Sequence, residues 1–223
     1  HTYQVIAYNA AGSGAKSEEK TVFLSAVLSV PTTFDLTKKD VFEIFQVIDA
    51  NDDEKTWKWS ESYGTYYSYS SSLAADDYLV SAPVKFEAGK NYRVVVTANC
   101  ADAGYPEAFR VLVGKEATVA GLNTLIADTT WVATEEAESN EAEFTATEDG
   151  TYYVAIQAVS PANMWRLNIS SLAIENGAEP TAPAAVTEFA AVAGEKGALE
   201  VNVSFNAPAK AINGTDLTDD LTI

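Results

Sequence analysis

Apolar and polar residues alternate with a period of two along many short stretches of the chain. Such alternation is typical of β-strands that bury one face, whereas the periodicity of an amphipathic helix is nearly absent. Turn signals such as Glu148-Asp-Gly and Ile212-Asn-Gly separate the stretches. We expect apolar faces at Tyr3, Val5 and Ala7; Tyr92, Val94, Val96 and Ala98; Phe109, Val111 and Val113; Tyr152, Val154 and Ile156; Leu167, Ile169, Ser171 and Ala173; and Leu199, Val201, Val203 and Phe205. Many short strands at this spacing predict an all-β fold, either a sandwich or a barrel.

Two changes in composition divide the chain. One lies between Ser25 and Pro31, and the other is the Pro- and Ala-rich stretch that begins at Gly177. Such a stretch is typical of an extended linker. We therefore expect three segments, which are residues 1–26, 27–177 and 178–223.

The charge of the chain limits the partners that it can bind. The sequence has 32 acidic and 14 basic residues, which gives a net charge of −18. Nucleic acids and anionic membrane surfaces both require a basic protein surface, so neither is an expected partner. No apolar run reaches the length that spans a membrane.

The residue types that most enzymes use are nearly missing. The chain has one His, which is His1, and one Cys, which is Cys100. A zinc site needs about four such ligands, and a Ser-His-Asp or Cys-His site needs a well-placed imidazole. No phosphate-binding loop, nucleotide fingerprint or nucleophile elbow is present either. With 32 acidic residues, chance pairs of carboxylates indicate nothing about glycoside hydrolysis, so we predict that the chain is not an enzyme.

The two end segments resemble parts of fibronectin type III domains. The run Tyr3-Gln-Val-Ile-Ala-Tyr-Asn-Ala-Ala-Gly is similar to the last two strands of that family, and residues 180–223 resemble its opening strands. Phe205 stands where a tryptophan is common, so the second match is looser. Because two or three strands alone are marginally stable, the ends either pair into one composite sandwich or are pieces of truncated domains.

The middle segment resembles the cleaved-adhesin, or gingipain-type haemagglutinin, domain over residues 32–176. The resemblance rests on two signatures, Asp-x-Asn-Asp-x-x-x-x-Trp from Asp49 to Trp57 and Asp-Asp-Tyr-Leu-Val-x-x-Pro from Asp76 to Pro83. It implies a jelly-roll β-sandwich from a surface adhesin or protease of an anaerobic bacterium. The expected fold class is therefore an all-β jelly-roll sandwich with partial fibronectin-like strands at both ends.

An acidic loop in this segment could hold a metal ion. Asp49, Asn51 and Asp53 alternate, and such a turn offers several oxygen atoms to a hard cation such as Ca²⁺. The loop lacks the glycine and the final glutamate of an EF-hand, which excludes that motif. The family resemblance implies structural calcium, with Asp77 as a further ligand if the two loops meet. Relatives often have an acidic pair where this chain has Ser170-Ser171, and a solvated acidic turn is the alternative.

A stretch rich in Tyr and Ser, residues 60–72, is the candidate ligand-binding segment. Its tyrosines are Tyr63, Tyr66, Tyr67 and Tyr69. Tyr rings provide rigid contact area and Ser hydroxyls provide adaptable hydrogen bonds, a mixture that suits the binding of sugars or proteins. The alternative is an irregular loop whose rings lie against the sandwich.

The tryptophans and the residues after Asp77 are expected to contribute to the core. Trp57 and Trp59 alternate and share one face of a strand, and we expect Trp57 and Leu79 to be buried. Trp131 and Trp165 are expected in the core first, with a binding platform as the second possibility.

Together these observations predict a non-catalytic, secreted or cell-surface binding module that recognises carbohydrate or a host glycoprotein. The alternatives are a structural spacer or an accessory domain of a larger secreted protease or glycoside hydrolase. The chain opens in the middle of a strand pattern at His1, so we expect a piece of a longer protein whose adjacent modules are its partners.

Overall fold

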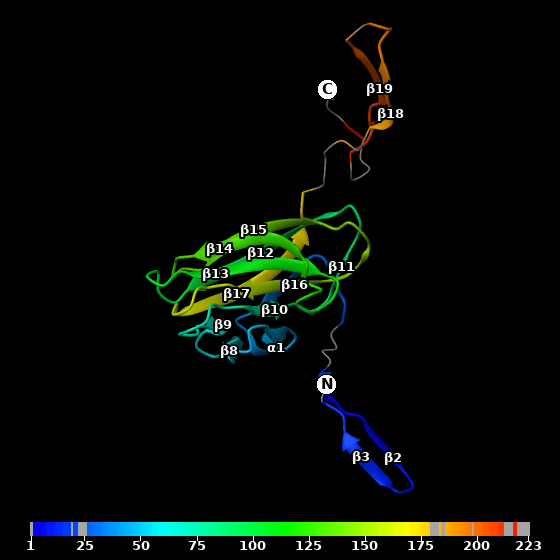
Figure 1. Cartoon of the computed structure of the whole chain (residues 1–223). Helices are drawn as coiled ribbons and strands as arrows, with labels where there is room; N and C mark the ends of the chain where they lie inside the picture. The colour runs from blue at the N-terminus through cyan, green and yellow to red at the C-terminus, as the bar shows by residue number, and fades with distance from the viewer. Residues whose placement is uncertain are drawn as a thin grey trace.

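The computed structural model describes residues 2–18, 20–21, 26–178, 183, 186–197, 199–211 and 216–217. Between residues 28 and 176 the strands form two facing sheets, so the predicted all-β jelly-roll sandwich is confirmed (Figure 1). The helix α1 (Lys39–Phe42) is a single short turn. Within the described ranges no helix has the length and apolar character needed to cross a membrane.

The first sheet has seven strands and centres on β16. Its main strand order is β14 (Thr124–Val132), β13 (Glu107–Gly114), β16 (Gly150–Ala158), β10 (Asp77–Val80) and β7 (Gln46–Asp49). Two short strands complete it, because β11 (Val84–Phe86) pairs with β16 and with β5 (Leu28–Ser29).

The second sheet has six strands and centres on β17. Its main strand order is β15 (Glu138–Thr145), β12 (Asn91–Cys100), β17 (Arg166–Asn176), β9 (Gly64–Ser68) and β8 (Trp57–Ser60). The short strand β6 (Thr32–Asp35) also pairs with β17.

In each sheet the long central strand pairs along one side with two short strands in succession. On β16, β10 is followed by β11, and Ser81 lies between them. The Ser81 N–H donates to the Val154 carbonyl at 2.8 Å, and the Ser81 hydroxyl accepts from the Val154 N–H at 3.0 Å. The side chain thus satisfies a buried backbone donor at the gap between the two strands.

The core lies between the sheets and is built from alternate residues of the long strands. In β12 every second residue from Tyr92 to Cys100 is buried, as the alternation predicts. The predicted inner faces at 109–113 and 152–156 are buried as well, and so are Trp57 and Leu79.

The predicted inner face of β17 is correct only for the first part of the strand. Beyond Ser170 the alternation changes phase, and Leu172 and Ile174 are buried in place of Ser171 and Ala173. The pairing with β12 shifts register at this point, which is the mark of a β-bulge. One extra residue in the strand reverses which side chains face the core.

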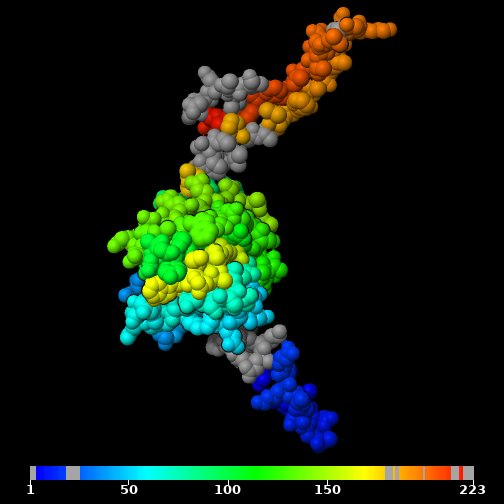
Figure 2. Space-filling model, turned by 60° about the vertical axis from the view of Figure 1, so that its left-hand side comes forward, coloured from blue at the N-terminus to red at the C-terminus, as the bar shows by residue number. Residues whose placement is uncertain are grey.

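The strands at both ends of the chain pair only locally in the described part. Pairing joins β1 (Thr2–Tyr3) to β4 (Lys20–Thr21), β2 (Ile6–Asn9) to β3 (Gly12–Lys16), and β18 (Thr187–Ala193) to β19 (Val201–Asn206). The β2–β3 and β18–β19 hairpins lie outside the sandwich (Figure 2). Their exposed apolar residues include Tyr8 and Val201. A composite sandwich of the two ends is not formed among the described residues of this one chain. Their assignment to fibronectin type III domains stays a prediction.

We expect a chain of residues 27–177 alone to fold and to unfold at nearly the same temperature as the full chain. The reason is that the buried core and the two sheets lie within this range. Calorimetry of both chains checks this, with an expected difference below about 2 °C. A decrease of more than about 5 °C would show that the end segments stabilise the sandwich.

Candidate functional site

The middle of the Tyr- and Ser-rich stretch is a strand. Residues 64–68 form β9, which pairs with β8 and with the start of β17. Because side chains alternate along a strand, Tyr66 and Ser68 face outward, whereas Thr65 and Tyr67 are buried.

Tyr67 is therefore a correction to the predicted ligand-binding set. Its side chain is 1% exposed and packs edge-on against Trp57, with ring centroids 5.9 Å apart. Tyr67 cannot meet a ligand in this position. The other three predicted tyrosines are wholly or partly exposed at the surface.

Arg166, at the start of β17, organises the first half of the exposed site. Its guanidinium lies 3.7 Å from the centre of the Tyr63 ring, which is a close cation–π contact. The Arg166 Nε donates to Asn168 Oδ1 at 3.0 Å, and the Tyr63 and Tyr66 rings meet edge to face at 5.7 Å. These contacts hold the Tyr63 ring in place although it is 50% exposed.

The second half of the site is a shallow pocket of about 220 Å³ beside Trp165. Tyr105 and Trp165 stand at right angles with ring centroids 6.2 Å apart, and Tyr69 joins them through its N–H, which donates to the Trp165 carbonyl at 3.2 Å. Asn163 and Met164 complete the lining. Tyr63, Tyr66, Tyr69, Tyr105 and Trp165 are named the aromatic surface below.

The sequence pattern did not point to Tyr105 and placed Trp165 first in the core. In the structure these side chains are 45% and 46% exposed. Tyr105 follows the end of β12 and Trp165 precedes β17, so only the pairing of β17 with β12 and β9 brings them beside Tyr69. Trp131 is also exposed, on the edge strand β14 of the other sheet.

The buried carboxylate of Glu107 holds the backbone of Trp165 in place. Glu107 Oε1 accepts a hydrogen bond from the Trp165 N–H at 2.7 Å, and the Glu107 side chain is fully buried. Burial raises the pKa of Glu107, while Ser160 and the Trp165 N–H oppose the shift. Glu107 thus sets the position of the Trp165 backbone without reaching a ligand.

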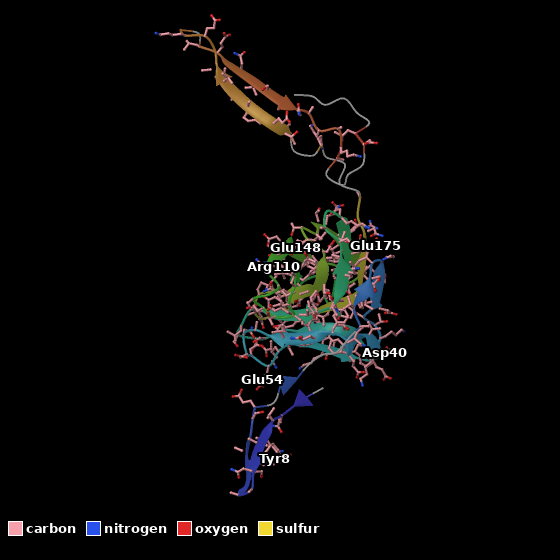
Figure 3. The ribbon with its side chains drawn as sticks, turned by 90° about the vertical axis from the view of Figure 1, so that its right-hand side faces the viewer. Tyr8, Asp40, Glu54, Arg110, Glu148 and Glu175 are labelled. Carbon is pink, nitrogen blue, oxygen red and sulfur yellow. The ribbon has the colours of Figure 1, made fainter. Side chains whose placement is uncertain are left out.

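The two acidic loops do meet, as the metal-site prediction required. Asp49 and Asp77 are direct partners across the antiparallel pair β7–β10. Most acceptors of the first loop are used by its own backbone, however. Asp49 accepts from the N–H groups of Asp53 and Glu54, at 3.3 and 2.9 Å, and Asn51 Oδ1 accepts from the Asp53 N–H at 3.2 Å. Glu54 follows at the surface (Figure 3).

Asp77 is the most unusual of these acidic groups. Its side chain is fully buried, and its Oδ1 atom and the Oδ2 atom of Asp53 have no hydrogen-bond partner. Burial raises the pKa of Asp77 to about 6; Thr56 lowers it, and the nearby charges of Asp49 and Asp53 raise it further. Buried carboxylates without a counter-charge are costly, so this position favours a cation or a proton.

The donor set fits calcium in kind, because every candidate ligand atom is oxygen. It falls short in number, since no three Asp, Glu, His or Cys side chains in the described part of the chain gather as metal ligands do. Asp53 and Asp77 would be the carboxylate ligands, and backbone carbonyls and water would have to supply the rest. Calcium therefore stays a prediction.

Comparison with known proteins finds solved structures that resemble the fold. No family model and no curated protein sequence match the chain. Among solved structures, the K1 cleaved adhesin domain of Lys-gingipain from Porphyromonas gingivalis W83 is similar at 12% identity, with a TM-score of 0.49, over 60% of this chain and 90% of that one. A xylan-binding domain from Paenibacillus barcinonensis is similar at 11% identity, with a TM-score of 0.42, over 60% of this chain and 91% of that one. The expected similarity to cleaved-adhesin domains is thus found, and it concerns the fold.

We expect E107A to lower the free energy of unfolding by about 1–3 kcal/mol, because the Trp165 N–H loses its acceptor. E107Q keeps an oxygen at the same place and should leave the amide signal of Trp165 unchanged in an NMR spectrum. Denaturant unfolding and NMR of both variants check this. If both variants lose the same free energy of unfolding, the charge of Glu107 stabilises the fold, and not its oxygen atom as a hydrogen-bond acceptor.

We expect Ca²⁺ to raise the unfolding temperature of the native chain and to leave D77N unaffected. With EDTA present, D77N should be the more stable protein at about pH 7.5, by up to about 3 kcal/mol. The sign follows because the folded-state pKa of Asp77 lies above its ordinary value of 3.8, so stability falls as the pH rises from about 4 through 6. The advantage of D77N should therefore vanish near pH 4. Thermal unfolding of both proteins, with millimolar Ca²⁺ and with EDTA, measures the effect of the metal and the effect of the substitution. If Ca²⁺ does not change the unfolding temperature of the native chain, the metal site is excluded.

Proposed function

We propose that the chain is a non-catalytic carbohydrate-binding module that binds sugar units on the aromatic surface. The observation that supports this most is the exposed right-angled pair of Tyr105 and Trp165 beside Tyr69. Large aromatic rings that remain exposed in a fixed arrangement mark an interaction surface.

The chemistry of the aromatic surface suits a sugar. The C–H faces of a sugar ring can stack on Tyr and Trp rings, and the hydroxyls need both donors and acceptors nearby. The rim supplies these through the Asn163 amide and the tyrosine hydroxyls, while the Arg166 guanidinium is partly engaged with Tyr63. The net charge of −18 disfavours polyanionic glycans, so the proposed ligand is a neutral saccharide.

The proposed setting is outside the cell, on a secreted or surface-attached protein with neighbouring modules. The exposed apolar residues of β18 and β19 support the presence of further modules, because such faces are normally covered. A host glycoprotein ligand would be bound through its sugar chains under this proposal. Calcium, where present, would have a structural role near Asp77 and would not touch the sugar.

We expect W165A and Y105A to weaken saccharide binding by at least about tenfold, or about 1.4 kcal/mol. W131A is the matched control, because Trp131 is 56% exposed but lies on the other sheet. A glycan array followed by calorimetry on the best neutral glycan measures the effect. Blank arrays, or equal affinity for W165A and the native chain, would contradict the proposal.

A further inference from the structure

A second and larger cleft lies at the opposite end of the sandwich from the aromatic surface. Its volume is about 570 Å³, within the range typical of small-molecule sites. The loop after β13 (115–123) forms one wall, and the turn after β15 (146–149) forms the other. The name end cleft is used below for this site.

The wall of the end cleft has a fixed shape. The 115–123 loop folds back so tightly that a Cβ atom on Gly114 would collide with the carbonyl oxygen of Gly121. The Thr118 carbonyl accepts from the N–H groups of Gly121 and Leu122, both at 3.0 Å, and the Leu122 side chain is buried. A cleft with a rigid wall loses little conformational entropy when a ligand binds.

The inner side of the end cleft is aromatic. Phe144 and Tyr152 line it, with ring centroids 5.9 Å apart, and both rings pack on the buried Phe86. The Tyr152 hydroxyl donates to the Glu148 carbonyl at 3.0 Å, which fixes the ring. The two ring planes meet at 62°, and Phe144, which is only partly buried, is the ring that reaches the cleft.

Paired charges stand beside this face. Lys115 Nζ lies 2.8 Å from Glu148 Oε2 and 5.3 Å from the centre of the Tyr152 ring. An ammonium donor and a carboxylate acceptor side by side can bind two neighbouring hydroxyl groups of one ligand. Asn123 and Thr147 add neutral donors and acceptors at the rim.

These features together exclude the other simple ligand classes. The lining has two carboxylates, Glu116 and Glu148, against one lysine, which disfavours an anion such as phosphate. A cationic ligand would have to compete with Lys115, which already occupies the Tyr152 face. A purely apolar ligand would remove water from the charged pair of Lys115 and Glu148 and give it no hydrogen bond in return.

We propose that the end cleft binds one neutral saccharide unit, packed against Phe144 and hydrogen-bonded by Lys115 and Glu148. The groups of the end cleft are separate from those of the aromatic surface. The two sites lie at opposite ends of β12, whose ten residues span about 30 Å. A chain with both sites could bridge two glycan strands.

The test is an NMR titration of the full chain with a panel of neutral mono- and disaccharides that includes glucose, galactose, mannose, xylose and N-acetylglucosamine. Binding at the end cleft should shift the amide signals of Asn123 and Thr147. The variants K115M and E148Q should each weaken this binding at least about tenfold. Both side chains are largely exposed, so the fold should survive, and unchanged spectra elsewhere in the variants would verify it.

The outcomes separate the two sites. W165A should leave saccharide binding at the end cleft unchanged. K115M should leave saccharide binding at the aromatic surface unchanged. Shifts at Asn123 and Thr147 that are lost only in K115M and E148Q support the end cleft even when no glycan binds near Trp165. The proposal is overturned if no sugar shifts these signals at concentrations of tens of millimolar, or if K115M and E148Q bind as tightly as the native chain.

Discussion

The burial of two apolar sheet faces against each other is the interaction on which the rest of the structure depends. The inner residues of β12, β13, β16 and β17 form one continuous core between the sheets. Because this contact removes the apolar side chains from water, it fixes the strand order and thereby the position of every loop. Both candidate binding sites lie at the ends of the long strands, where the core stops and polar groups can reach water.

Two carboxylates are buried near one end of the sandwich, those of Asp77 and Glu107. Both side chains are fully buried. Glu107 has a backbone N–H as its hydrogen-bond donor, whereas one oxygen of Asp77 has no donor. Glu107 accepts from the Trp165 backbone and so connects the core to the aromatic surface. Asp77 has an unsatisfied oxygen beside other acidic groups, and its raised pKa reflects this cost. The two buried carboxylates thus bear on stability, and Glu107 also holds the backbone of Trp165 in position.

Sequence patterns predicted the regular parts of the fold well. The alternation in β12 and β16 identified their buried faces, because an unbroken strand has a strict period of two. The same rule failed in β17, where the bulge at Ser170 adds one residue and no local sequence signal announces it. Tyr67 was misassigned for a related reason: all the tyrosines of residues 60–72 were assigned to one ligand-binding segment, although β9 runs through it and turns every second side chain inward.

By itself the sequence determined the fold class, the core faces of its straight strands, the acidic loops and the scarcity of catalytic residues, since these follow from local periodicity and composition. Only the tertiary structure decided which side chains share a surface. Trp165, Tyr105 and Tyr69 are separated by tens of residues, and Lys115 meets Glu148 only because β13 and β16 are paired. The physical reason is that strand pairing and register, which bring distant residues together, depend on packing across the whole sandwich and not on neighbours along the chain.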